Sequence, residues 1–337
     1  MRNTILLGAV LAAGMGGAAA ASTLEDVRAR GTLLCGVNSG LFGFATQDAN
    51  DHWSGFDVAL CRAVAAAVLG DSNKVEFVPT KPTTRFTALA AGDVDLLARN
   101  TTWTFGHDVG EKVDFVGVSY YDGQAFLARK QLGVSSVKEL EGVSVCFQSG
   151  TTNELNLQDY FQANEMSYTP VPVEDSAEAR QKYLDGACDV YTSDASGISA
   201  IRATFENPDD HVILPEIISK EPLGPLVRHG DNRWGDLVRW VLNALIVAEE
   251  MGVTSANVEE LSAGTNDPEV NRLLGVEGEF GAMLGLDADW AKRAIQAGGN
   301  YGEIFARNIG EDTPVGLARG LNGQWRDGGL LFAPPFR

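Results

Sequence analysis

The sequence predicts an α/β protein made of two units with a helical C-terminal part, and three observations lead to this fold class. Short runs rich in β-branched residues alternate with segments of helical periodicity, a pattern typical of βαβ units around a mainly parallel sheet. The alternation stops after residue 98 and starts again near residue 143. The chain also has 337 residues, more than one hydrophobic core usually covers.

The first unit is expected to contain three strands and two helices. The run GFDVALCRAVAAAVLG has helical periodicity and ends at Gly70, a residue typical of a helix C-terminus. The run TTRFTALAAGD has Thr at its start and Gly92 near its end, which indicates a second, shorter helix. In chain order, we predict strands at 32–37, 74–79 and 93–98 and helices at 55–70 and 83–93.

The second unit repeats this alternation, with VSVCF as a strand and NELNLQDYFQAN as an amphipathic helix. No loose linker separates the units in the sequence, which indicates that the chain crosses between them more than once. The remainder of the chain is predicted as short helices with Gly stops and an extended end. The predicted strands are 143–147, 168–173, 188–192, 212–218 and 225–228, and the predicted helices are 153–164, 176–185, 195–205 and 233–251.

The N-terminus has the layout of a secretory signal peptide. Arg2 precedes the apolar run ILLGAVLAAGM, and the small residues GGAAAAS follow. The apolar run is too short for a comfortable membrane span, and no later stretch is long and apolar enough. We therefore expect residues 1–21 to be removed on export and the mature chain to be soluble; a buried N-terminal helix or an uncleaved anchor is the alternative.

The four cysteines are expected to form disulfides, because an exported protein enters an oxidising compartment. Four cysteines allow three connectivities, and the spacing favours the local pairs Cys35–Cys61 and Cys146–Cys188, one in each unit. The sequence contains no C-x-x-C, and its four histidines have no metal-ligand spacing. We expect neither a metal nor a cofactor.

The formal net charge of −19 excludes one class of partner. A strongly acidic chain repels phosphate backbones and anionic lipid surfaces, so nucleic-acid binding is not expected. An acidic balance is common among exported proteins and identifies no other partner.

Three polar turns follow predicted buried strands: RNTTWT at 99–104, QSGTT at 148–152 and SDASG at 193–197. Ligands of open α/β sheets bind at the carboxyl ends of the strands. The structural alternative is that Thr151, Thr152 and Asp194 only cap the helices that follow. Three such turns together favour a ligand site.

The groups in these turns suit a ligand with an anionic end and a cationic end, such as a free amino acid. Amides and hydroxyls of the first two turns would bind the carboxylate, and Asp194 would bind the ammonium group. Phe42, Trp53 and Trp103 would supply apolar walls, or belong to the core. The sequence contains no hydrolase, metalloprotease, Walker or Rossmann motif.

The segments GTLLCGVNSGLFGF, TRFTALAAGDVDLLARNTTWT, VCFQSGTTNELNLQDYF and CDVYTSDASG resemble the periplasmic substrate-binding proteins of polar amino-acid ABC transporters, in particular the general L-amino-acid-binding branch. The resemblance covers nearly the whole mature chain, including the ending GGLLFAPPFR. It implies a type II periplasmic binding fold, in which two α/β lobes close on the ligand about two crossing strands near 118–124 and 215–224. Lobe 1 would comprise 22–118 and 219–337, with a helical C-terminal extension, and lobe 2 would comprise 119–218.

The resemblance also implies roles for individual residues. Asn100 and Thr102 would hold the α-carboxylate from lobe 1, and Thr152 with Thr151 would do so from lobe 2. Asp194 would take the α-ammonium. The residues near the side-chain end of the ligand would be Asn38, Leu41, Phe42 and Trp53.

One position departs from the family pattern. The family usually has an Arg after the T-W-T turn, where it clamps the carboxylate with two hydrogen bonds, and this sequence has His107 there. Imidazole offers one donor when neutral and carries no permanent charge. Three outcomes are open: His107 binds as an imidazolium, Arg99 or Arg85 replaces the missing Arg, or the ligand is not a standard α-amino acid.

Three functions follow from the resemblance and this departure. The first is a monomeric periplasmic receptor that delivers free L-amino acids to an inner-membrane ABC permease. The second is a periplasmic enzyme on the same fold, similar to cyclohexadienyl dehydratase, with His107 as a general acid or base. The third is a sensory amino-acid receptor that signals to a chemoreceptor or kinase.

Overall fold

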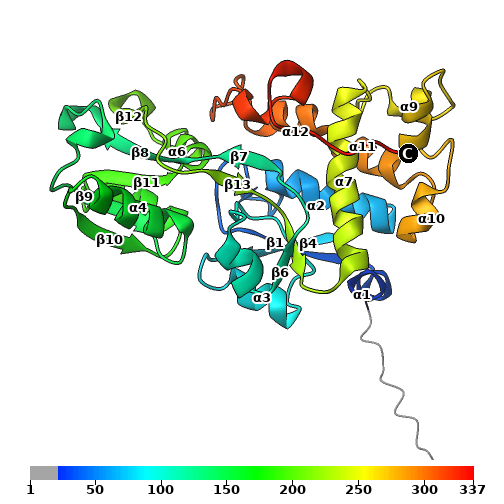
Figure 1. Ribbon diagram of the computed structural model, residues 1–337, viewed down its shortest axis with the longest axis horizontal. Coiled ribbons are helices and arrows are strands. Elements are labelled where there is room, and N and C mark those ends of the chain that lie inside the picture. Colours follow the sequence, from blue (N-terminus) through cyan, green and yellow to red (C-terminus); the bar gives the residue numbers. More distant parts are fainter. Residues whose placement is uncertain (1–21) are drawn as a thin grey trace, which may run out of the picture.

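The computed structural model describes residues 22–337, and the expected signal peptide at 1–21 lies outside the described residues. Two sheets lie side by side and are joined by a pair of antiparallel strands, β7 (Tyr120–Asp122) and β13 (Glu221–Leu223), which cross from one lobe to the other (Figure 1). This is the two-lobed α/β fold with a hinge of two crossing strands that the sequence predicts.

The sheet of the first lobe has the strand order β4–β1–β5–β14–β6. β1 pairs in parallel with β4 and β5, as expected for βαβ units, whereas β14 is antiparallel to both of its neighbours. The reason is that β14 enters this sheet from the second crossing strand. The elements are α1 (Thr23–Arg30), β1 (Leu33–Asn38), the hairpin β2 (Thr46–Gln47) and β3 (Trp53–Ser54), α2 (Phe56–Leu69), β4 (Val75–Thr80), α3 (Arg85–Ala91), β5 (Leu96–Leu97), β6 (Val113–Phe115) and β14 (Leu226–Arg228).

The sheet of the second lobe has the order β10–β9–β11–β8–β12, and β8 runs antiparallel to both of its neighbours. The strand predicted at 212–218 is shorter than expected, because Pro215 has no backbone N–H to continue the ladder. The elements are β8 (Gln124–Arg129), β9 (Ser144–Gln148), α4 (Thr152–Ala163), β10 (Thr169–Val173), α5 (Ser176–Leu184), β11 (Val190–Asp194), α6 (Ala195–Arg202) and β12 (His211–Ile213).

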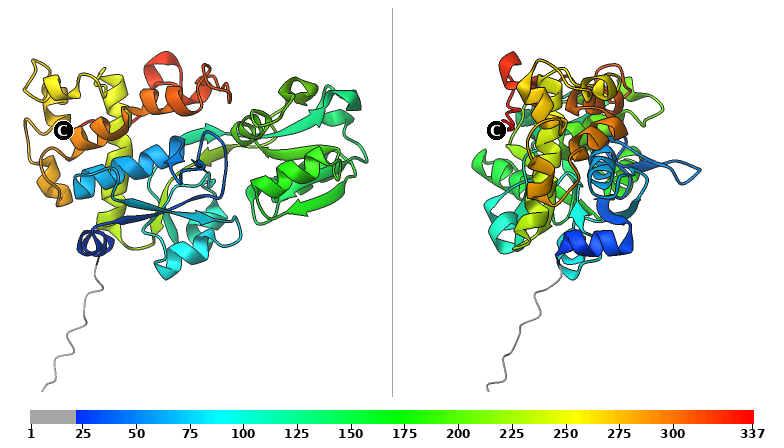
Figure 2. Two further views of the ribbon diagram at one scale, coloured as in Figure 1. Left: turned by 180° about the vertical axis from the view of Figure 1, so that it is seen from behind. Right: turned by 90° about the vertical axis from the view of Figure 1, so that its right-hand side faces the viewer.

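The C-terminal extension is helical and packs on the first lobe (Figures 1 and 2). Its long helix α7 (Asn232–Glu250) carries a continuous apolar side, and the side chain of Phe336 near the chain end is 2 % exposed. The extended end of the chain is therefore part of the hydrophobic core. The other helices are α8 (Val258–Leu261), α9 (Pro268–Leu273), α10 (Phe280–Leu284), α11 (Trp290–Gly298) and α12 (Tyr301–Asn308).

Both disulfides are local. Cys35 of β1 is bonded to Cys61 of α2, and Cys146 of β9 is bonded to Cys188 just before β11. The structure therefore contains the pairing that the spacing favours, and each bond lies within one lobe. Neither of them restricts motion between the lobes.

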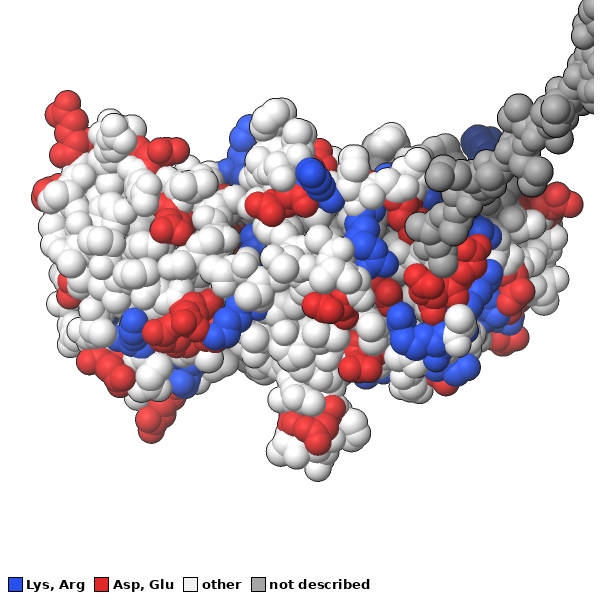
Figure 3. Space-filling model, turned by 90° about the horizontal axis from the view of Figure 1, so that it is seen from below, with Lys and Arg blue, Asp and Glu red and all other residues white. Residues whose placement is uncertain are grey.

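Two features of residues 22–337 concern membranes and metal ions. Across this part of the chain, no helix is both long and apolar enough to cross a membrane, and no group of His, Cys, Asp and Glu side chains could hold a metal ion. Figure 3 shows acidic and basic side chains interspersed over one face of the molecule.

Candidate functional site

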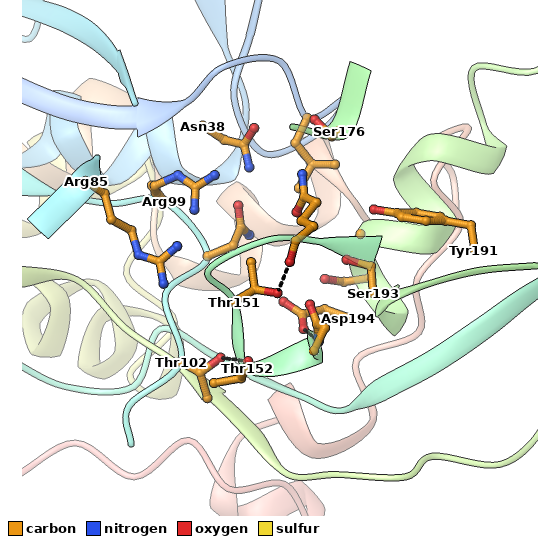
Figure 4. Close-up of a pocket in the computed structure, with 16 residues that line it drawn as sticks. Asn38, Arg85, Arg99, Thr102, Thr151, Thr152, Ser176, Tyr191, Ser193 and Asp194 are labelled. Atoms are coloured by element: carbon orange, nitrogen blue, oxygen red, sulfur yellow. Dashed lines mark hydrogen bonds between the residues drawn. The ribbon is translucent and has the colours of Figure 1, made fainter. Parts of the chain in front are cut away.

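A polar pocket lies between the two lobes, at the carboxyl ends of β1, β5, β9 and β11. The three polar turns marked in the sequence all reach it, and Figure 4 shows side chains from both lobes pointing into one space. The lining residues from the first lobe are Asn38, Leu41, Arg85, Arg99, Asn100 and Thr102, and those from the second are Gln148, Thr151, Thr152, Asn153, Ser176, Tyr191, Ser193, Asp194, Ser196 and Gly197.

Two buried guanidinium groups form part of the first-lobe wall. Arg85, the first residue of α3, is 2 % exposed, and Arg99 is 3 % exposed. Burial lowers the pKa of Arg85 to about 9, with help from the neighbouring charge of Arg99, and lowers the pKa of Arg99 to about 10. Both side chains remain cations at neutral pH, and desolvation makes each of them a strong site for an anion.

The surroundings of the two arginines differ. Arg99 Nε donates to the carbonyl oxygen of Thr80 at 3.2 Å, and the buried carboxyl of Asp57 is close enough to favour its charge. Arg85 packs over the ring of Phe86, 4.6 Å from its centroid. In Figure 4 Arg99 lies on the side of Asn38, whereas Arg85 lies on the side of Thr102.

The second-lobe wall contains a buried carboxylate. Asp194 ends β11, is 8 % exposed and accepts a hydrogen bond from Asn153 Nδ2 at 3.0 Å. Within the described chain its side chain makes no capping bond to α6, so the capping interpretation of this residue is wrong. Burial raises the pKa of Asp194 well above its usual range, and the carboxyls of Asp122 and Glu221 raise it further. A cationic ligand group would relieve this repulsion.

The N-terminus of α4 also faces the pocket, through Thr151 at the N-cap position and Thr152, the first residue of the helix. The Thr151 hydroxyl donates to the carbonyl oxygen of Gln148 at 2.7 Å, and the Thr152 hydroxyl donates to Glu221 at 2.9 Å. Neither hydroxyl caps the helix, whose first N–H groups carry the positive end of the helix dipole. This arrangement suits a carboxylate.

Unpaired polar atoms are concentrated in the pocket. Residues 22–337 contain eleven buried side-chain nitrogen or oxygen atoms without a hydrogen-bond partner, and five of them belong to pocket-lining residues. Such atoms are costly in a folded protein and call for an explanation. A polar ligand that pairs with them supplies it. The five are Asn38 Oδ1, Arg85 Nε, Asn100 Oδ1, Gln148 Nε2 and Ser196 Oγ.

The lobes touch each other around the pocket. The hydroxyls of Thr102 and Thr152 are 3.3 Å apart across the cleft, and Lys81 Nζ forms an ion pair with Glu174 at 2.5 Å. A Cβ added to Gly150 would lie 3.0 Å from a side-chain carbon of Thr83 in the other lobe. The structure is therefore that of the closed form.

Seven of the ligand-binding residues predicted from the sequence line the pocket, as do the alternative cations Arg85 and Arg99, and four predicted residues lie outside its lining. Phe42 is 37 % exposed, and Trp53 packs against Phe77 with ring centroids 5.8 Å apart. Trp103, another candidate wall, stacks on Phe115 instead. The seven are Asn38, Leu41, Asn100, Thr102, Thr151, Thr152 and Asp194, and the four are Phe42, Trp53, Trp103 and His107.

The His107 side chain packs against other residues of the first lobe and does not line the pocket. Its Nδ1 lies 2.8 Å from the carbonyl oxygen of Thr102, and its ring packs 4.9 Å from that of Phe86. Burial lowers its pKa, and the nearby charge of Arg85 lowers it further, whereas the hydrogen bond that the ring donates to the Thr102 carbonyl oxygen raises it. The imidazole is therefore neutral at pH 7 and donates its Nδ1 proton to the carbonyl.

Several lining residues were not predicted, although they belong to the polar turns or lie next to them in the sequence. Gln148, Ser193 and Ser196 belong to the same polar turns, and Tyr191 precedes Ser193 by two residues on the same face of β11. Ser176 carried no such signal, because only the folding of the second lobe brings the start of α5 to the cleft.

Two α/β lobes, two crossing strands and a polar pocket between the lobes define a type II periplasmic binding protein. The model of the bacterial extracellular solute-binding proteins, family 3, matches residues 33–256, and the chain belongs to this family. The matched segment ends shortly after α7, so the part of the C-terminal extension from α8 onward lies beyond it.

Relatives resemble the chain over its full length. It is 62 % identical to the glutamate/glutamine/aspartate/asparagine-binding protein BztA of Rhodobacter capsulatus and 53 % identical to the general L-amino acid-binding periplasmic protein AapJ of Rhizobium johnstonii, over all of each chain. A solved periplasmic binding protein from Brucella ovis with glutathione bound has a TM-score of 0.92 and 54 % identity, covering 94 % of this chain and all of that one.

Proposed function

We propose that the protein is a periplasmic receptor that binds free L-amino acids between its lobes and delivers them to an inner-membrane ABC permease. The observation that carries the proposal is the opposition of charges in one buried pocket: Asp194 in one lobe faces Arg85 and Arg99 in the other. A zwitterion pairs with both walls and thereby holds the lobes together. The names of its full-length relatives support this function.

In this proposal each wall takes one part of the ligand. Asp194 accepts the α-ammonium, while Thr102, Thr152 and the start of α4 bind the α-carboxylate. Arg85, close enough to His107 to lower its pKa, takes the place of the Arg usual at position 107. Arg99 then faces the ligand side chain, which favours glutamate and aspartate, with their amides as weaker ligands.

The same proposal covers export and assembly. Residues 1–21 are the signal peptide, lobe 1 is formed by 22–118 with 219–337, and lobe 2 by 119–218. The mature chain acts as a monomer in the periplasm. One full-length relative, AapJ, is named a periplasmic amino acid-binding protein, which supports this localisation.

We propose binding rather than catalysis. One similar structure is an ancestral amino acid-binding protein described as a precursor of cyclohexadienyl dehydratase, with 29 % identity and a TM-score of 0.58. The side chain offered as a general acid or base, His107, bonds to Thr102 and lies outside the pocket lining of the described chain. Among the described residues that line the pocket, Asp194 is the one with a carboxyl group. The proposal assigns this carboxyl to the ligand ammonium and not to a catalytic step.

Calorimetry on the mature protein, unfolded and refolded to remove bound ligand, tests the proposal against the twenty L-amino acids and glutathione. Glutamate and aspartate are expected to bind tightest, at micromolar affinity or better, followed by glutamine and asparagine. Binding of glutathione alone would contradict the amino-acid proposal and make the protein a receptor for γ-glutamyl peptides. Loss of amino-acid uptake in a strain lacking the protein separates transport from sensing.

Replacing His107 is expected to have little effect on affinity. The variant His107→Gln should bind glutamate within about threefold of the wild type, because a neutral side chain outside the pocket makes no charge-assisted bond to the ligand. The affinity of both proteins should also change with pH in the same way. A His107→Gln variant that loses the pH dependence of binding would restore the imidazolium hypothesis.

Ligand binding is expected to release protons. The pKa of Asp194 is raised in the free protein, and a bound ammonium favours the ionised carboxylate. The affinity for the amino acid should therefore fall as the pH is lowered through this raised pKa. At a pH below this pKa, the Asp194 carboxyl should release a proton when the ligand binds. At about pH 5 and at about pH 8, binding enthalpies are measured in two buffers that both buffer at that pH and differ in their heat of ionisation, and the difference gives the number of protons released, which should be greater at the lower pH. Equal enthalpies in both buffers at both pH values would contradict the prediction.

A further inference from the structure

The C-terminal segment after α12 reaches back to the first crossing strand, although it lies outside the segment matched by the family model. The side-chain amide of Asn322 bonds both backbone groups of Tyr121 in β7. The Tyr121 N–H donates to Oδ1 at 2.7 Å, and Nδ2 donates to the Tyr121 carbonyl oxygen at 3.0 Å. Asn322 is 3 % exposed, and its planar amide holds the strand as a neighbouring strand would.

The segment that presents Asn322 is itself fixed to the first lobe. Arg319 makes two hydrogen bonds to the carboxylate of Glu249 in α7, at 2.8 and 3.1 Å, and Gln324 Nε2 donates to the same carboxylate at 3.0 Å. The hydroxyl of Tyr301 in α12 donates to the carbonyl oxygen of Ser119 at 2.8 Å. The extension thus attaches β7 to the first lobe as far as Tyr121.

On each crossing strand, the next residue toward the second lobe is bonded to the second lobe instead. On β7, the carboxylate of Asp122 accepts a hydrogen bond from the Ser196 N–H of α6 at 3.3 Å. On β13, the Pro222 carbonyl oxygen accepts from the Trp103 N–H of the first lobe at 2.8 Å, whereas the Glu221 carboxylate accepts from two side chains of α4.

The register of the two strands makes these changes coincide. Tyr121 is paired with Pro222, and Asp122 is paired with Glu221. The row formed by the first pair is bonded to the first lobe, and the row formed by the second pair is bonded to the second lobe. The attachment therefore changes from the first lobe to the second between these two rows, a few residues beyond the expected lobe boundary at 118/119.

We propose that the C-terminal extension is a clamp on the hinge: Asn322 fixes the first-lobe half of the crossing strands, so that opening bends the chain between Tyr121 and Asp122 and between Glu221 and Pro222. Without the clamp, Gly117, whose φ is 157°, would be the flexible point. A clamped hinge has fewer open conformations to lose on closure. The clamp therefore strengthens ligand binding.

Two variants of the full mature chain test the clamp. Asn322→Ala removes the two bonds to Tyr121, whereas the control Asn271→Ala removes a similarly buried amide of the extension that bonds only to Thr265 and Glu277, away from the hinge. In ligand-free protein, hydrogen exchange of the Tyr121 amide is expected to rise about tenfold in Asn322→Ala and to stay near the wild-type rate in Asn271→Ala. The dissociation constant for glutamate should rise about three- to tenfold in the first variant only.

Wild-type exchange at Tyr121 in Asn322→Ala, or equal effects of the two variants on exchange and affinity, would overturn the proposal. If Asn322→Ala does not fold, Asn322→Ser replaces it, since serine brings no charge into this buried position and its single hydroxyl cannot reproduce both bonds to Tyr121. The exchange measurement needs no ligand. Failure of the wild type to bind glutamate would thus contradict the proposed function and leave the clamp decided by exchange alone.

Discussion

The variant Asp194→Asn is expected to weaken binding of every α-amino acid by a factor of about 10² to 10³. An ammonium buried in the closed pocket loses its charged partner, and breaking a buried ion pair costs about 3–5 kcal/mol. Asn has the same shape and keeps a carbonyl oxygen for Asn153, so the pocket itself should persist. Calorimetry with glutamate and glutamine measures the loss.

Thermal unfolding separates this loss of binding from loss of fold. The pKa of Asp194 is raised by burial and by Asp122 and Glu221, so its ionised form destabilises the ligand-free protein at neutral pH. Ligand-free Asp194→Asn should therefore unfold at the wild-type temperature or above it. Asp159→Asn, on the exposed side of α4, is the matched control and should bind normally. Affinity of Asp194→Asn within threefold of the wild type would remove Asp194 from the site.

The variant Arg85→Met is expected to weaken glutamate and glutamine equally, by a factor of about 10 to 10². Arg85 is assigned to the α-carboxylate, which both ligands share, and a charge-assisted bond in a buried site contributes about 1.5–3 kcal/mol. Arg85→Lys keeps the charge without the guanidinium geometry and should recover only part of the affinity. Calorimetry on the three proteins gives the ratio for each ligand.

Arg99→Met provides the contrast, because Arg99 is assigned to the ligand side chain. This variant should weaken glutamate more than glutamine and so reduce the preference between them. Since Arg99 also faces the buried Asp57, the double variant Arg99→Met with Asp57→Asn keeps the local charge balanced. If Arg85→Met changes the ratio of the glutamate and glutamine affinities and Arg99→Met leaves this ratio unchanged, the two assignments are reversed.

Most of the fold was predictable from the sequence because it rests on local patterns. Hydrophobic periodicity and Gly stops predicted α2 and the parallel strands of both sheets. The same patterns could not predict β6, because its three residues are too few for a period to appear. Pro215 was visible in the sequence, and its missing N–H ended β12 earlier than predicted.

The candidate site was predictable to the extent that it consists of strand ends. A polar turn after a buried strand must lie at the edge of its sheet, so the turns containing Asn100, Thr152 and Asp194 come together in any closed two-lobed arrangement. The aromatic residues Phe42 and Trp53 gave no such constraint, because an aromatic side chain is equally at home in a core or at the surface.

The sequence by itself determined that this protein has two α/β lobes with polar turns facing each other, since periodicity, turn chemistry and strand ends are encoded by neighbouring residues. Only the tertiary structure decided which cation enters the pocket: packing of α3 places Arg85 there, while the Thr102 carbonyl draws His107 away. It also decided that Asn322 holds Tyr121, a contact across 201 residues of chain. Side-chain orientation and long-range contacts depend on how elements pack, which no local pattern contains.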